Sequence, residues 1–123
     1  MSAMQRVLAT GACFLVILLS GLWLSRSERP LNVALSTLHK LVGLGAAILL
    51  IITIRGVHEA ASLSTTGWVA VVVTGLLFAS LAATGALLTR DQPVPTAIQK
   101  VHQIVPYLTV LSSAATLYLL LGG

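Results

Sequence analysis

Two histidines occupy nearly the same setting in this sequence of 123 residues. Residues 35–42 read LSTLHKLV and place His39 beside Lys40, and residues 98–105 read IQKVHQIV and place His102 in a similar apolar run. An imidazole nitrogen can ligate a metal ion or exchange a proton, and it is costly among apolar side chains unless it has a partner. What these histidines can do depends on the elements that hold them.

The composition indicates that those elements lie in a membrane. Hydrophobic residues make up 57% of the chain and charged residues 8%, and the mean hydropathy is +1.00. This leaves too little polar surface to cover a soluble domain. Four apolar stretches, at about residues 7–24, 33–54, 67–88 and 97–121, are each near the ~20 residues that span a bilayer as a helix.

The connections between these stretches are short and carry helix-breaking residues, such as Pro30, Gly56 and Pro93. Lipid offers no hydrogen-bond partners to the backbone, so the spans must be helices. The first stretch is longer than the apolar core of a signal peptide, and no A-x-A-like cleavage site follows it. We therefore predict an all-α fold: one membrane domain over residues 1–123, a four-helix up-down-up-down bundle.

The chain also aligns with itself at an offset of 63, the difference between positions 102 and 39. Matched pairs are Glu28 and Asp91, Pro30 and Pro93, Ala34 and Ala97, Leu35 and Ile98, Leu38 and Val101, His39 and His102, Leu41 and Ile104, and Val42 and Val105. This indicates internal duplication of a helical hairpin, with two copies related by a pseudo-twofold axis along the membrane normal.

The duplication predicts where the histidines lie. Each follows its matched proline by nine residues on spans that run in the same direction, so both should lie at the same depth, roughly 12 Å along the helix. Neighbouring helices pack ~8–10 Å apart, which puts diagonal helices of a bundle about 11–14 Å apart. That gap suits two imidazoles that hold a metal ion from opposite sides of a flat macrocycle.

We therefore predict one haem per chain, with His39 and His102 as axial ligands of the iron. Haem needs only two protein ligands, whereas zinc needs about four. A hydrogen bond between helices, a different metal or a role in proton transfer are the alternatives.

Flanking residues fit a porphyrin. Gly43, one turn after His39, would let a flat ring approach the helix, although small residues also serve ordinary helix packing. Lys40 and Lys100 are predicted to meet the haem propionates, together with the loop arginines Arg26, Arg29 and Arg90. The positive-inside rule explains the same cations, and it predicts extracytoplasmic termini and a haem nearer the cytoplasmic side.

The imidazole rings need groups that orient them. Ser36 and Gln99, each three residues before a histidine, are candidates, and the carbonyls of Leu35 and Ile98 compete for this role. The hydroxyls of the third and fourth spans, Thr84 among them, are expected to bond to carbonyls of their own helix.

With these motifs, LHKLVG around His39 and VHQ around His102, the chain resembles the transmembrane b-type cytochromes, most nearly the small bacterial cytochrome b-561-like four-helix proteins. The resemblance implies haem b and electron transfer in a bacterial-type inner membrane. It implies partners such as quinol or quinone, ascorbate, ferric iron, oxygen species or a redox protein. It assigns no catalytic residue and leaves open whether the chain is a small oxidoreductase.

One departure from that family concerns the third histidine. Many relatives hold two haems between two histidine pairs, whereas His58 has no mate in this sequence. Arg55, His58 and Glu59 are instead expected to form a solvated cap at the opposite membrane face.

Two other classes remain as alternatives. A small multidrug or ion transporter would need an intramembrane carboxylate, and the three acids, Glu28, Glu59 and Asp91, are predicted to lie in loops. A non-catalytic assembly or scaffold subunit would need only the repeat and the glycine-rich spans. The net charge of +4 follows from topology and gives no reason to expect nucleic acid. The oligomeric state is left open.

Overall fold

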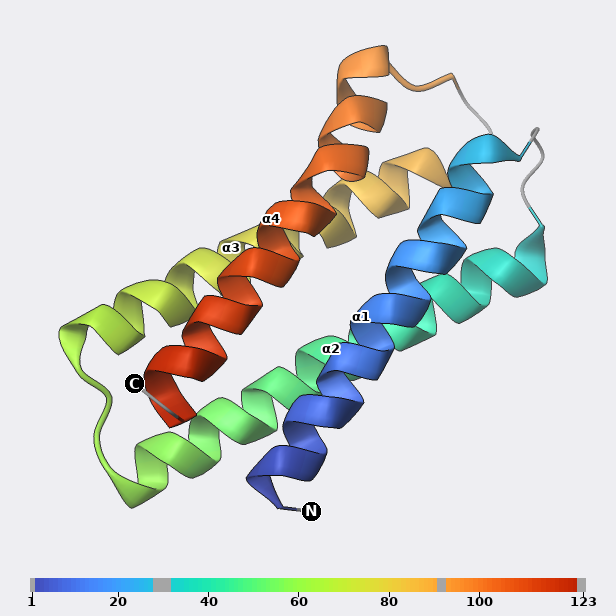
Figure 1. Ribbon diagram of the computed structural model, residues 1–123. Coiled ribbons are helices and arrows are strands. Elements are labelled where there is room, and N and C mark those ends of the chain that lie inside the picture. Colours follow the sequence, from blue (N-terminus) through green and yellow to red (C-terminus); the bar gives the residue numbers. More distant parts are fainter. Residues whose placement is uncertain (1, 28–31, 91–92, 122–123) are drawn as a thin grey trace. The chain divides into compact units, whose positions relative to one another are not determined.

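The structure is a computed structural model that describes residues 2–27, 32–90 and 93–121. It contains four helices, α1 (Ala3–Arg26), α2 (Val33–Ala60), α3 (Thr65–Leu88) and α4 (Thr96–Leu121) (Figure 1). All four are long and apolar enough to cross a bilayer. The chain is therefore an integral membrane protein, and its predicted all-α fold is confirmed.

The helices form two hairpins. Contacts divide the chain into two compact units, Met1–Ser62 and Leu63–Gly123. In the first unit α1 packs antiparallel to α2, and in the second α3 packs antiparallel to α4 (Figure 1). The predicted up-down arrangement is thus present within each hairpin, and the grouping of all four helices into one domain stays a prediction.

Side-chain caps fix the start of α1, α2 and α3. Ser2 and Gln5 form a capping box, in which the Gln5 N–H donates to Ser2 Oγ (3.1 Å) and the Ser2 N–H to Gln5 Oε1 (2.8 Å). Asn32 and Ser64 accept in the same way from the N–H groups of Leu35 and Gly67. The capping box explains why α1 begins four residues before the predicted position.

The predicted end of α2 is wrong. The helix does not stop at residue 54 but runs on through Arg55, His58 and Glu59, and it ends where the Ala61 N–H donates to Val57 O (2.9 Å). At 28 residues α2 is about 42 Å long, more than the ~30 Å of hydrocarbon, so its last turns can reach water. Charged side chains can therefore continue the helix there.

Corresponding residues are buried in the two hairpins. Ala46, Leu50 and Thr53 of α2 match Thr109, Ser113 and Thr116 of α4 at an offset of 63. Thr10 and Ser20 of α1 match Thr74 and Thr84 of α3 at an offset of 64. The duplication is therefore supported by burial, and the second hairpin is one residue shorter between its two helices.

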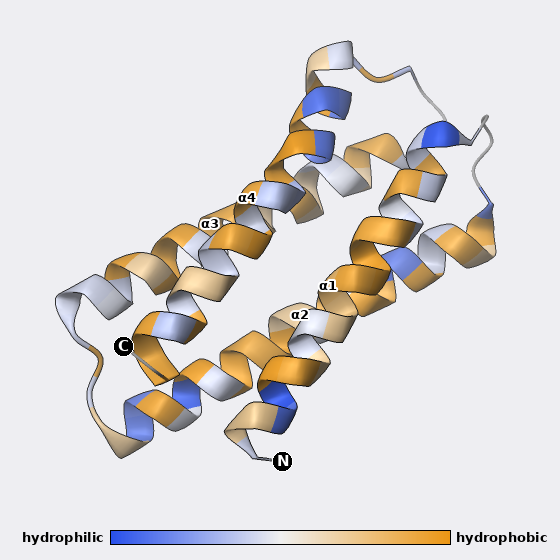
Figure 2. Ribbon diagram, in the orientation of Figure 1, coloured by the Kyte–Doolittle hydropathy of each residue, from blue (hydrophilic) through white to orange (hydrophobic). Residues whose placement is uncertain are grey.

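Small and hydroxyl side chains fill the helix contacts because lipid provides no hydrophobic drive for helices to associate. Among the described residues only Ala46 and Leu50 are buried hydrophobics, whereas many large apolar side chains, such as Leu15, Leu41 and Leu76, are exposed. Thr10 and Thr53 satisfy their hydroxyls on carbonyls of their own helices, at 2.7 and 2.8 Å. Apolar residues cover the middle of each helix and hydrophilic ones gather near helix ends (Figure 2).

Candidate functional site

The His39 ring lies in the contact between α1 and α2. Its Nδ1 is 2.9 Å from the hydroxyl oxygen of Ser20, which is buried on α1. The next residue, Gly21, has no side chain, and a Cβ there would lie 3.1 Å from His39 Cε1. A serine and a glycine in sequence thus provide a hydrogen-bond partner and the space for the ring.

The second hairpin repeats this arrangement around His102. Its Nδ1 is 2.7 Å from Thr84 Oγ1 on α3, and a Cβ on Gly85 would lie 3.1 Å from His102 Cε1. Each histidine is therefore held by a hydroxyl residue and a glycine from the preceding helix. Ser20 and His39 are 19 residues apart in the sequence, and Thr84 and His102 are 18 apart. This difference of one residue is the same as that between the offset of 64, which relates α1 to α3, and the offset of 63, which relates α2 to α4.

We infer from the hydrogen-bond network which nitrogen carries the proton. A hydroxyl donates a single hydrogen bond. Ser20 Oγ donates to the carbonyl of Ile17 (3.1 Å), and Thr84 Oγ1 donates to that of Ser80 (2.8 Å). With the hydroxyl proton given to the carbonyl, each hydroxyl oxygen accepts from its histidine, and we therefore assign the proton to Nδ1 and the lone pair to Nε2.

A neutral imidazole with its lone pair on Nε2 is a form that ligates transition metals. A hydrogen bond at Nδ1 also sets the rotation of the ring and raises the basicity of the ligating nitrogen. The site in each hairpin can thus supply one oriented nitrogen ligand.

The predicted cationic residues lie at the same hairpin ends as the histidines. Arg26 ends α1 and Lys40 follows His39, both at the end where the two helices of the first hairpin are connected. Arg90 follows α3 and Lys100 precedes His102 in the equivalent part of the second. Both lysines are exposed, and Arg29 lies outside the described residues together with Glu28, Pro30 and Asp91.

Gly43 lies one turn after His39, and a Cβ there would meet no atom within 4 Å. The contact between α1 and α2 therefore does not require a glycine at this position.

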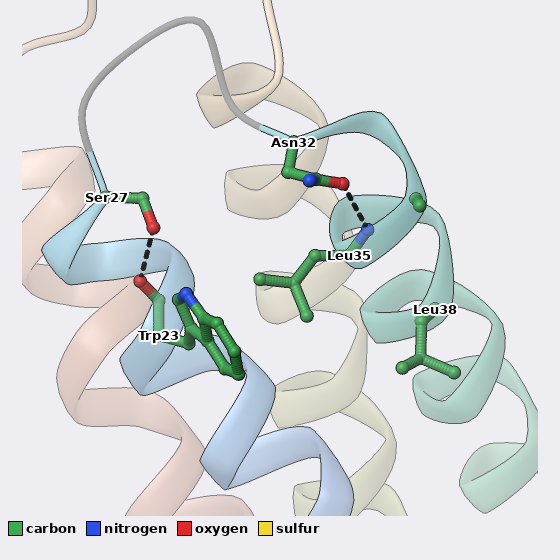
Figure 3. Close-up of a pocket in the computed structure, with 6 residues that line it drawn as sticks. Trp23, Ser27, Asn32, Leu35 and Leu38 are labelled. Carbon is green, nitrogen blue, oxygen red and sulfur yellow. Dashed lines mark hydrogen bonds between the residues drawn. The ribbon is translucent and has the colours of Figure 1, made fainter.

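A small apolar pocket lies at this end of the first hairpin. It has a volume of about 330 Å³ and is lined by Trp23, Ser27, Asn32, Ala34, Leu35 and Leu38 (Figure 3). Polar groups that line the pocket already have hydrogen-bond partners within the protein. Ser27 Oγ donates to Trp23 O (2.8 Å), and the Leu35 N–H donates to Asn32 Oδ1 (3.0 Å).

The hydroxyl partners were not found from the sequence. Ser36 and Gln99 were the candidates, but the rings bond to Ser20 and Thr84 on the neighbouring helices instead. Thr84 does bond to its own helix as expected, and it accepts from His102 as well.

A sequence signal for these residues exists. At an offset of 64, α1 and α3 share the pattern T-G-x2-F-x5-[ST]-G, which begins at Thr10 and at Thr74 and ends at Gly21 and at Gly85. An alignment at the single offset of 63 does not bring these residues into register, because α1 and α3 are related by an offset of 64.

His58 lies on the last turns of α2, at the other end of the first hairpin. It is 19 positions from His39, which corresponds to about 28 Å along the helix. Beside it, the exposed side chains of Arg55 and Glu59 form an ion pair at 3.5 Å. The structure therefore separates His58 from the candidate site.

No protein-family model, curated protein or solved structure matches this chain.

We predict that ¹⁵N NMR of selectively labelled histidine will show His39 and His102 as neutral Nδ1–H tautomers in the protein freed of any cofactor. Ser20→Ala and Thr84→Val remove the oxygen that accepts from Nδ1. Each variant should therefore give a mixture of the two neutral tautomers at its own histidine and leave the other histidine unchanged. Ser25→Ala, which removes an exposed hydroxyl bonded to Leu22 O, is the control. An Nε2–H tautomer in the unmodified protein would contradict the assignment.

We also predict that Gly21→Ala will displace the His39 ring. The new Cβ would lie 3.1 Å from Cε1, and overpacking of this kind costs about 1–3 kcal/mol. Gly11→Ala on the same helix is the matched control, since its Cβ would meet nothing within 4 Å. Thermal unfolding and the His39 NMR signals measure both effects, and equal behaviour of the two variants would contradict the role given to Gly21.

Proposed function

We propose that this chain is a membrane b-type cytochrome that holds one haem b through His39 and His102 and transfers electrons. The observation that carries the proposal is the repeated hydroxyl–imidazole bond. In each hairpin it leaves Nε2 with the lone pair that an axial ligand must present. Two such nitrogens are the complete protein ligand set of a six-coordinate haem.

The surrounding residues fit the group. Gly21 and Gly85 give each ring its place against the neighbouring helix, and Gly43 leaves open space on α2. Lys40, Lys100, Arg26 and Arg90 can neutralise propionates, because they lie near the histidine ends of their hairpins and cations there favour carboxylates.

Haem, when bound, supplies one-electron exchange between its ferric and ferrous states. The protein's contribution is to keep both imidazoles neutral, oriented and among apolar side chains, where exclusion of water and the ligand hydrogen bonds set the reduction potential. With His39 and His102 as its two protein ligands, a bound haem would favour electron transfer over binding of an exchangeable ligand at the metal.

The resemblance to cytochrome b-561-like proteins supports the same function and proposes its partners. These are a quinol or quinone in the membrane, another small redox molecule or a redox subunit. We place the chain in a bacterial-type inner membrane with extracytoplasmic termini, because five cations, Arg26, Arg29, Lys40, Arg90 and Lys100, flank the opposite face.

The scaffold alternative has one observation in its favour, since a histidine bonded to a hydroxyl on the next helix also ties two helices together. The transporter alternative gains none. Glu59 proves to be helical and not in a loop, but it lies in the last turns of α2, where it is exposed and paired with Arg55.

We predict that His39→Ala and His102→Ala will each abolish six-coordinate haem binding, whereas His58→Ala will leave about one haem per chain. The measurement is haem content per chain by pyridine haemochromogen, together with the reduced spectrum. Added imidazole should partly restore the low-spin spectrum in His39→Ala, because it supplies the missing nitrogen. Full haem content in either of the first two variants would overturn the ligand assignment. A chain that takes up no haem at all would favour the scaffold.

A further inference from the structure

Arg6 lies across α2 at the end of the first hairpin opposite His39. Its Nη1 and Nη2 are 3.9 and 4.0 Å from the position that a Cβ on Gly56 would take. Arg6 precedes Ser20 by 14 residues, or about 21 Å along α1. Since a large side chain at position 56 would occupy this space, Gly56 allows the guanidinium to lie against the backbone of α2.

The guanidinium has an unsatisfied donor. Nε of Arg6 is buried and has no hydrogen-bond partner among the described residues. Glu59, the described carboxylate of this hairpin, is paired with Arg55. A buried donor of a charged group that lacks a partner is costly, and arginine cannot shed its charge. Within the part of the chain that the structure describes, this donor therefore lacks an acceptor, and the charge of Arg6 favours an anion.

The repeat shows that the hairpin itself does not need this arrangement. At the corresponding positions of the second hairpin, Ala70 replaces Arg6 and Leu119 replaces Gly56. The first hairpin thus has a long side chain on α1 beside a glycine on α2, and the second hairpin has a short side chain on α3 and a large one on α4. The pair of Arg6 and Gly56 is a property of the first hairpin alone.

The depth of Arg6 indicates which anion it would meet in a membrane. The apolar run of α1 begins at Val7, so Arg6 lies at the boundary between hydrocarbon and head groups. Met4 and Leu8, on either side of it in the sequence, are 65% and 64% exposed and offer apolar surface to acyl chains. At this depth the abundant anion is lipid phosphate, which a guanidinium binds through two N–H groups.

We propose that Arg6, placed over Gly56, binds the phosphate of an anionic phospholipid at the membrane face opposite His39. The other charged and titratable groups of the last turns of α2 are Arg55, His58 and Glu59. Of these, Arg55 and Glu59 are paired at 3.5 Å. The site is independent of haem binding, because it lies at the far end of the hairpin.

The test measures lipid retention by the full chain in neutral detergent, by native mass spectrometry with phosphatidylglycerol or phosphatidylcholine added. The unmodified chain should retain phosphatidylglycerol about fivefold more strongly than phosphatidylcholine, as expected for one arginine near anionic head groups. Arg6→Gln should remove this preference, and Gly56→Leu should weaken it by displacing the guanidinium. Arg55→Gln is the matched control and should keep the preference, since Arg55 is exposed and paired within its own helix.

The controls keep the test decisive. Circular dichroism and elution volume confirm the fold of Arg6→Gln, so the result does not depend on Gly56→Leu folding. Equal retention of the two lipids by the unmodified chain would overturn the proposal. The same holds for an equal loss in Arg55→Gln, which would indicate non-specific surface charge. Displacement of phosphatidylglycerol by millimolar inorganic phosphate would assign the site to free phosphate, and this result would also overturn the proposal of a lipid site.

Discussion

The candidate site in each hairpin depends on the bond between an imidazole Nδ1 and a hydroxyl of the neighbouring helix. It requires a hydroxyl residue, a glycine directly after it and a hydroxyl proton already given to a carbonyl. Among apolar side chains such a bond is not readily exchanged for one to water, so it favours one orientation of the ring and the inferred Nδ1–H tautomer. The lone pair at Nε2 of His39 and of His102 follows from this bond.

Duplication of the hairpin makes the two halves comparable, and their differences are informative. Around the histidines the same residue types recur, Ser20 with Gly21 and Thr84 with Gly85. Away from them the copies diverge. Thr74 bonds to Ser112 (2.6 Å) and Thr116 (3.0 Å) across the second hairpin, whereas its counterpart in the first bonds only within its own helix. The copies therefore share the groups that hold each histidine, and they differ in the hydrogen bonds made by Thr10 and Thr74.

Much of the fold could be predicted from the sequence, because apolar runs of span length and short connections allow few alternatives. The histidines were found because they stand out among apolar residues. Ser20 and Thr84 were missed because the two copies differ by one residue between their helices, so that a single offset aligns one helix of each hairpin and not the other. The end of α2 was misplaced because Gly56 reads as a helix breaker, while its place beside Arg6 depends on a tertiary contact.

The central claim is that two oriented imidazoles of one chain hold one haem. The most direct measurement is the optical and near-infrared magnetic circular dichroism spectrum of the purified protein, oxidised and then reduced, with haem counted per chain. We expect sharp reduced bands of a low-spin b haem, a ferric charge-transfer band of bis-histidine ligation and about one haem per chain. A high-spin spectrum, or a preparation that stays colourless after haem is supplied, would contradict the account.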